Sequence, residues 1–104
     1  MKSLDKELCP VMKAVEIIGD PTCLLIIRKL VEGPKRYFEI RDYINNISEA
    51  TLSKKLKFLV TKGVIKRTYR KEIPPVVFYE IKKNIKELKN IIKYLEEFGD
   101  KYSR

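Results

Sequence analysis

The stretch SEATLSKKLKFLVTKG at residues 48–63 predicts one helix that carries both a core seam and an exposed cationic face. At about 100° per residue, its large apolar side chains fall together on one side. These side chains are Leu52, Leu56, Leu59 and Val60. Ser48 can cap the first turn, Glu49 suits the positive end of the helix dipole, and Gly63 can adopt the left-handed conformation that ends a helix. One side is therefore expected to pack, and the other to meet a partner.

The side opposite the leucines is small, hydroxylic or basic. It consists of Ala50, Thr51 and Lys54, with Lys55, Lys57 and Lys62 beside them. Small side chains let a backbone approach another surface closely and lysines supply charge, which is typical of a helix that enters a DNA major groove. The candidate base contacts are Ser48, Ala50, Thr51 and Lys54.

An ordinary amphipathic surface helix has much of the same pattern, so the neighbouring segments decide between the two interpretations. Phe58 fits the DNA interpretation poorly, because it falls on the outer side where a polar residue is usual. We expect Phe58 to pack on the following hairpin or on neighbouring tyrosines.

A polar turn separates this helix from a preceding one. The segment YFEIRDYI at residues 37–44 has one packing face, made of Tyr37 or Phe38 with Ile40, Tyr43 and Ile44. Asn45 and Asn46 end this helix, and Ile47 can staple the entry of the next one. A helix, a short polar turn, a cap and a second helix form the helix-turn-helix signature, here at about residues 36–63.

Two further helices are expected upstream. The first starts at Pro10, which suits an initial helical turn, and continues at helical spacing to Gly19. Asp20 followed by Pro21 is a second start signal, and the sequence CLLIIRKLV is apolar on nearly all sides before the Glu-Gly-Pro at residues 32–34. This second helix is expected to be the central buried one, followed by a short strand or turn at residues 35–36.

After Gly63 the pattern changes to that of strands. VIKRTYR and VVFYEI are β-favouring, and the charged loop KEIPP at residues 71–75 joins them. A basic hairpin directly behind a helix-turn-helix is a wing, here at about residues 64–81, although an edge hairpin that only closes the domain has the same pattern. The candidate phosphate contacts on this unit are Lys35, Arg36, Lys55, Lys57, Arg67, Arg70 and Lys71.

The last segment, at about residues 84–102, repeats apolar residues at the spacing of a helical seam. A core this small can use only part of so wide a stripe, so we expect homodimerisation through this helix and the first one. The candidate dimerisation residues are Leu8, Val11, Met12, Ile85, Leu88, Ile92, Leu95 and Tyr102. The alternative is that both helices pack wholly within their own subunit.

The composition supports one mainly α domain over residues 1–104, with a small β-hairpin: a winged helix-turn-helix with a three-helix core, flanked by N- and C-terminal dimerisation helices. Residues 35–72 hold 11 Lys and Arg against 4 Asp and Glu, a net +7 of the chain's +9. Such a basic region attracts polyanions, with strong salt dependence. No apolar run is long enough to cross a bilayer and no secretory signal is recognisable, so a cytosolic location is expected.

Catalysis is not expected from this sequence. The chain has no His, its two cysteines are not in a C-x-x-C arrangement, and no Gly-rich phosphate loop is present. We therefore expect no metal and no cofactor. A winged-helix module whose basic face binds an acidic protein, rather than DNA, would have much the same sequence and is the main alternative.

Several local matches occur in the order typical of one family. The chain resembles the HxlR-type branch of winged helix-turn-helix transcription regulators, relatives of the MarR group. The matching positions are Cys9-Pro10-Val11, Gly19, residues 24–28, Gly33-Pro34-Lys35-Arg36-Tyr37, Ile40, Ile47-Ser48, Leu52, Leu56, Leu59, Gly63-Val64-Ile65, Arg67, Pro74-Pro75 and Tyr79. Two positions depart from the family: Thr22 stands where a Trp is usual, and Val76 where an Arg often follows the two prolines.

The resemblance implies a cytosolic homodimer that binds a pseudo-twofold operator as a local repressor or activator. Some family members sense oxidants or electrophiles through the cysteine before the first proline, which makes Cys9 a candidate redox residue. Its position at a helix start, with Lys6 and Lys13 nearby in sequence, favours a thiolate. The alternative is that Cys9 is simply a small residue there. Cys23 is expected in the core.

Overall fold

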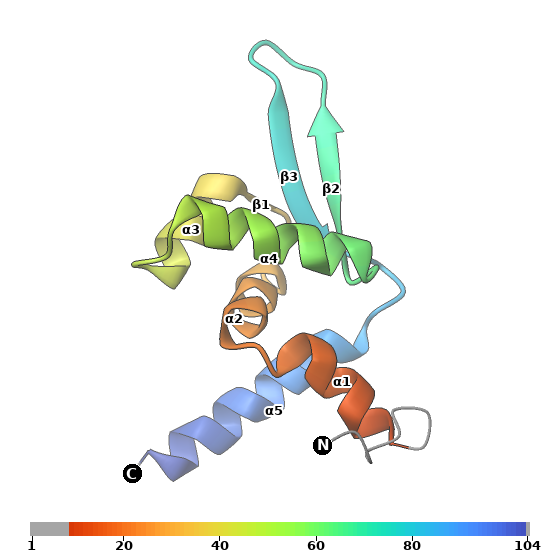
Figure 1. Cartoon of the computed structure of the whole chain (residues 1–104), viewed down its shortest axis with the longest axis vertical. Coiled ribbons are helices and arrows are strands. Elements are labelled where there is room, and N and C mark those ends of the chain that lie inside the picture. The colour runs from red at the N-terminus through yellow and green to blue at the C-terminus, as the bar shows by residue number, and fades with distance from the viewer. Residues whose placement is uncertain (1–8, 104) are drawn as a thin grey trace.

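The computed structural model describes residues 9–103, which form five helices and a three-stranded antiparallel sheet (Figure 1). The helices are α1 Pro10–Ile18, α2 Pro21–Leu30, α3 Tyr37–Ile44, α4 Glu49–Thr61 and α5 Glu87–Tyr102. The strands are β1 Lys35–Arg36, β2 Ile65–Arg70 and β3 Val76–Ile81. The predicted fold class, a mainly helical winged helix-turn-helix with a small β-hairpin as its wing, is confirmed.

Helix α2 lies at the centre, between the helix-turn-helix and the two outer helices (Figure 1). Its predicted cap is present, because the Asp20 carboxylate accepts a hydrogen bond from the Thr22 backbone N–H at 3.1 Å. Cys23, Ile26 and Ile27 are completely buried. Helix α2 is therefore the central buried helix that the sequence predicts, although Leu25 on one side of it is 39% exposed.

The turn between α3 and α4 uses two asparagines. Asn45 and Asn46 both have positive φ, at 65° and 54°, a region that Asn tolerates better than most residues. On α3 it is Tyr37, not Phe38, that packs against the core beside the buried Ile40. Tyr43, which was expected on that face, lies 39% exposed under the Lys29 ammonium.

The sheet has the order β1-β3-β2, and all its pairs are antiparallel. Strand β3 lies in the middle, with Tyr79 opposite Lys35 on one side and Arg67 on the other. The hairpin of β2 and β3 extends away from the helices as the predicted wing (Figure 1). The two-residue strand at 35–36 therefore ties the start of α3 to the base of this wing.

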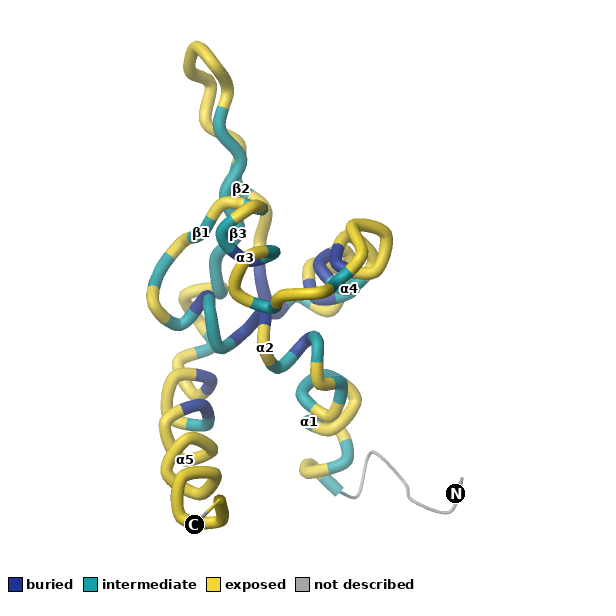
Figure 2. Tube along the Cα trace, turned by 90° about the vertical axis from the view of Figure 1, so that its left-hand side faces the viewer, coloured by how far each residue is buried: buried dark blue, intermediate teal, exposed yellow. Residues whose placement is uncertain are grey.

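The core is one cluster that draws on four helices and the start of β2. Its buried members are Cys23, Ile26, Ile27, Leu30, Ile40, Leu52, Leu56, Leu59, Val64, Ile65, Leu88 and Ile92. In Figure 2, α2 lies between α4 and α5, and the buried positions of α4 and α5 are on the sides that face α2. Val60 was predicted to belong to this seam, but it lies at its edge and is 37% exposed.

Helices α1 and α5 lie on the side of α2 away from the wing (Figures 1 and 2). Helix α5 begins at Glu87, three residues later than predicted, because residues 82–86 form a turn in which the Ile85 N–H donates to the Lys82 carbonyl at 3.0 Å. Among residues 9–103, no helix combines the length and apolar character that a membrane span requires.

Candidate nucleic-acid interface

Helix α4 is fixed at its start by Ser48 and along its length by three leucines. The Ser48 hydroxyl oxygen accepts a hydrogen bond from the Thr51 backbone N–H at 3.0 Å, which confirms the predicted N-cap. Leu52, Leu56 and Leu59 are buried, so the helix cannot rotate about its axis without exposing them. The direction of its outer face is therefore set by the core.

All four residues predicted to contact bases lie exposed at the start of α4: Ser48, Ala50, Thr51 and Lys54. The Ser48 hydroxyl also donates to Thr51 Oγ1 at 2.8 Å, so these two side chains hold each other in the first turn. The Lys54 and Lys57 ammonium groups are exposed and have no carboxylate partner among residues 9–103. The exposed side of these first turns of α4 is a small, polar and cationic surface.

Lys55 is placed differently from the prediction. It was assigned to DNA phosphates, but its Nζ lies 2.6 Å from Asp20 Oδ2, at the start of α2. The hydrogen bond from Lys55 lowers the pKa of Asp20, and the same bond raises the pKa of Lys55. Lys55 therefore ties α4 to α2, and its charge is already partly neutralised within the chain.

Asp20 is the residue of this site that the sequence did not reveal. It was expected only to cap α2, yet it also accepts hydrogen bonds from the Lys55 ammonium and, at 3.4 Å, from the Cys23 thiol. Asp20 and Lys55 belong to different helices, and local periodicity gives no signal for such a pair. The Asp20 carboxylate thus joins the start of α2 to the Lys55 side chain of α4.

Phe58 also differs from the prediction. It was expected to project outward and to pack on the hairpin or on neighbouring tyrosines, but it is partly buried against the core. It lines a hollow of about 210 Å³ with Glu16 of α1 and Asp20 before α2, and the Lys62 ammonium lies 5.8 Å from its ring centre. Its ring thus helps to seat α4 on α1 and α2.

The wing supplies a second group of cations. Arg67 is exposed and has no carboxylate partner in the described part of the chain. Arg70 lies 4.8 Å from the centre of the Phe78 ring and 3.2 Å from a Glu72 carboxylate oxygen, so its guanidinium is partly held. Lys71 is exposed at the start of the loop. These side chains extend the cationic surface of α4 along the hairpin.

The two predicted phosphate contacts on β1 have internal partners. The Lys35 ammonium lies 3.4 Å from Glu32, which also binds Arg28 and Lys29. The Arg36 guanidinium lies 5.4 Å from the Phe38 ring centre, while the Arg36 backbone N–H donates to the Glu39 carboxylate at 2.9 Å. Lys35 is therefore part of an ionic cluster at the base of the wing, and Arg36 remains exposed.

The predicted dimerisation residues separate into two groups. Leu88 and Ile92 are buried in the core of their own chain, and Ile85 packs against that core from the turn before α5. By contrast, Val11, Leu95 and Tyr102 are exposed, with Val11 at 68% and Tyr102 at 82%. Met12 is half-buried, and Leu8 lies outside the described residues. The apolar stripe of α5 thus packs into the core at the start of the helix and is exposed to solvent towards its end.

The two cysteines are both free thiols in different surroundings. Cys9 is partly exposed at the N-cap position of α1. Cys23 is completely buried, as predicted, and burial raises the pKa of its thiol to about 12. A difference in reactivity between the two thiols follows from this geometry.

Comparisons with known proteins agree with this arrangement. The family model described as HxlR-like helix-turn-helix matches residues 17–104. The uncharacterised HTH-type transcriptional regulator YdeP of Bacillus subtilis (strain 168) is 33% identical, over 94% of this chain and 77% of its own length.

Two solved structures are similar over nearly their whole length. A transcriptional regulator described as of the MarR family, from Porphyromonas gingivalis W83, is 36% identical with a TM-score of 0.81, covering 93% of this chain and 95% of that one. The redox regulator HypR in its oxidised form is 26% identical with a TM-score of 0.82, covering 89% and 96%. These matches confirm the predicted resemblance; YdeP and the Porphyromonas protein are described as transcriptional regulators, and HypR as a redox regulator.

Proposed function

The chain belongs to the HxlR-like helix-turn-helix family, and we propose that it acts as a homodimer on a DNA operator of pseudo-twofold symmetry. As a member of this family it is a DNA-binding regulator of transcription and not an enzyme. In the proposed complex, the α4 helix of each subunit enters a major groove and the wing follows the adjacent backbone. The alternative of a module that binds only acidic proteins is not favoured by these relatives.

The assignment of α4 to the major groove rests on the contrast between its buried apolar face and its exposed polar face. Three leucines bury one side, while Ala50, Thr51 and Lys54 occupy the exposed first turns. An α-helix fits the major groove only if its outer side chains near the groove floor are small or able to hydrogen-bond bases. Ser48 and Thr51 hydroxyls and the Lys54 ammonium supply such groups.

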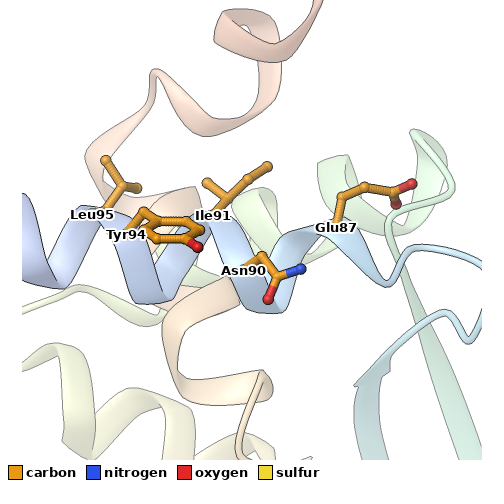
Figure 3. A pocket seen from close by; sticks show the side chains of 5 residues that line it. All are labelled: Glu87, Asn90, Ile91, Tyr94 and Leu95. Carbon is orange, nitrogen blue, oxygen red and sulfur yellow. The ribbon is translucent and has the colours of Figure 1, made fainter.

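The homodimer is supported by the apolar surface of α1 and α5. Val15, Tyr94, Leu95 and Phe98 are all exposed, and the Phe98 and Tyr102 rings stack on each other 6.0 Å apart in open solvent. Ile91, Tyr94 and Leu95 line a hollow of about 410 Å³ on α5 (Figure 3). Removing this surface from water by pairing with a second copy is favourable at about 25 cal/mol per Å².

A duplex-binding titration tests the proposal. An operator duplex is first selected from genomic DNA fragments by binding to the full chain. The chain is then titrated with this operator and with a random-sequence duplex, each at two salt concentrations. Because exposed lysines and arginines displace counterions from phosphates, we expect affinity for both duplexes to fall steeply as salt rises, with tighter binding to the operator. Absence of DNA binding at low salt would overturn the proposed mode.

We further propose that Cys9 senses oxidants or electrophiles. The support is its partly exposed thiol at the start of α1, together with the likeness to the redox regulator HypR. Because α1 belongs to the proposed dimer surface, alkylation of Cys9 would alter how two subunits meet and so change affinity for the operator.

A mass-spectrometric measurement of iodoacetamide labelling tests this idea. We expect Cys9 in the native chain to react faster than the same thiol in urea, and Cys23 to react far more slowly because it is buried with a raised pKa. Cys23 thus serves as an internal control. If native Cys9 reacts no faster than denatured Cys9, the sensing role is excluded.

A further inference from the structure

The segment between β3 and α5, together with the first turn of α5, carries a second cationic cluster, remote from the exposed first turns of α4. Lys82, Lys83, Lys86 and Lys89 all line one hollow of about 450 Å³. Hollows of this size are within the range that holds small organic molecules in proteins. The four lysines, together with this hollow, are called the lysine hollow below.

The floor of the lysine hollow is apolar. Leu30 and Val31 contribute from the end of α2, Ile81 from the end of β3, and Ile85 from the turn before α5. Leu30 is buried, and the other three are half-buried. The hollow is therefore lined both by aliphatic side chains and by four lysines, which are the two features that an amphipathic anion requires.

The charges of the four lysines have no ion-pair partner within the described part of the chain. No side chain of these four lysines has a carboxylate partner among residues 9–103, in contrast to Lys29, Lys35 and Lys55. Glu87, the acidic first residue of α5, lines the separate hollow that Tyr94 and Leu95 border. The lysine hollow thus keeps an uncompensated positive potential.

The place of the hollow separates it from the DNA-binding surface. The Lys82 backbone N–H donates to the Val64 carbonyl at 3.1 Å, which fixes the segment at the base of the hairpin. Figure 1 shows this base at the opposite end of the hairpin from the 71–75 loop. The lysines are therefore not needed to explain binding along the wing.

We propose that the lysine hollow binds a small organic carboxylate with an apolar body. The aliphatic floor covers the body, and the carboxylate lies among the ammonium groups, where charge-assisted hydrogen bonds are stronger than neutral ones. A simple inorganic anion would leave the floor exposed to water, and an uncharged chain would leave the lysines unpaired. The site therefore distinguishes this class of ligand from molecules that carry only one of the two features.

Amide chemical shifts of the full chain, titrated with octanoate, test the proposal without any DNA. We expect saturable shifts at residues 30–31 and 81–90. Acetate, which has the charge without the body, and 1-octanol, which has the body without the charge, should each bind at least about tenfold more weakly. Binding of 1-octanol as tight as that of octanoate, or shifts confined to other residues, would overturn the proposal.

A matched pair of double variants tests the lysines themselves. Lys86→Gln with Lys89→Gln removes two charges that line the hollow, and we expect octanoate to bind about tenfold more weakly or worse. Lys93→Gln with Lys101→Gln removes the same charge from α5 outside the hollow and should leave octanoate affinity unchanged. Equal loss in both pairs would mean general charge attraction, and no saturable binding to the unmodified chain would equally end the proposal.

Discussion

At Ser48 one hydroxyl group both caps α4 and lies on its exposed side. Its oxygen accepts the Thr51 N–H, while its proton goes to Thr51 Oγ1. We expect Ser48→Ala to lower the free energy of unfolding by about 1 kcal/mol, because the first turn loses its cap. Urea denaturation followed by circular dichroism measures this difference.

The control for this prediction is Ser48→Asp, since Asp is an equally good cap. We expect Ser48→Asp to keep the stability but to weaken DNA binding, because it places a carboxylate near the phosphates. If Ser48→Ala is as stable as the unmodified chain, the hydroxyl does not support the helix.

Asp20 connects the stability of the fold to pH. The hydrogen bond from Lys55 lowers the pKa of Asp20 in the folded chain. The ionised carboxylate therefore stabilises the fold above its unfolded pKa of about 3.9, and this contribution is lost as pH falls through the lower folded pKa. Asp20→Asn keeps a good cap but loses the ion pair, so we expect it to be less stable at neutral pH and to approach the unmodified chain in acid.

Urea denaturation at several pH values between neutrality and strong acid provides this test. Glu97→Gln is a charge-matched control on exposed α5, and it should not reproduce the pH-dependent difference. A stability difference for Asp20→Asn that stays constant over the whole range would show that the carboxylate charge is not involved.

The residues that could be predicted from sequence are those whose role is local. The Ser48 and Asp20 caps and the three leucines follow from spacing within one helix. Val60 is at the edge of the leucine stripe. Whether a residue at this edge is buried depends on which element packs beside it, and the spacing of residues within α4 does not reveal that element. For the same reason, the partner of Lys55 on α2 could not be foreseen.

At the scale of elements, we expect α4 to contact the bases and the wing to contact the phosphates. Lys54 lies on the first turns of α4, and Arg67 lies exposed on β2. We expect Lys54→Ala to weaken operator binding more than random-sequence binding, because a base contact is lost. Arg67→Ala should weaken both alike and reduce the slope of log affinity against log salt by about one.

Fluorescence titrations of both variants against both duplexes measure this division. Arg70→Ala is a useful comparison, because its guanidinium is already shared with Glu72 and the Phe78 ring. We therefore expect a smaller effect for Arg70→Ala than for Arg67→Ala. Identical behaviour of Lys54→Ala and Arg67→Ala on the two duplexes would contradict the assignment of α4 to the bases.

The elements themselves were largely predictable because each has its own start and stop signals. The start of α5 was not, since its apolar spacing continues back through Ile85 while the backbone does not. There the hydrogen bond from Lys82 to Val64 and the turn that follows redirect the chain. Tertiary contacts of this kind override a helical pattern.

At the scale of the whole molecule, one ionic contact joins the outer helix to the centre. Arg28 of α2 donates to Glu96 of α5, with a separation of 2.5 Å, and also binds Glu32. Through Glu32 this cluster reaches Lys35 at the base of the wing. The orientation of α5 is thus connected to that of the wing. The sequence alone could not show which part of α5 packs into the core and which part is exposed to solvent.

The exposed end of α5 provides the test of the proposed dimer. Phe98 is 66% exposed and stacks on Tyr102. We expect Phe98→Lys to shift the chain towards monomer, because it would place a charge in an apolar interface, while Phe98→Tyr remains dimeric. Sedimentation velocity measures the change, and an unaltered dimer in Phe98→Lys would exclude this part of α5 from the interface.

Hydroxyl-radical footprinting of the chain on its selected operator tests most directly whether paired α4 helices bind one face of the duplex. The proposed dimer predicts two protected regions of similar sequence, with centres about 10 base pairs or a multiple of one helical turn apart on the same face. A single protected region, or two regions on opposite faces of the duplex, would contradict it.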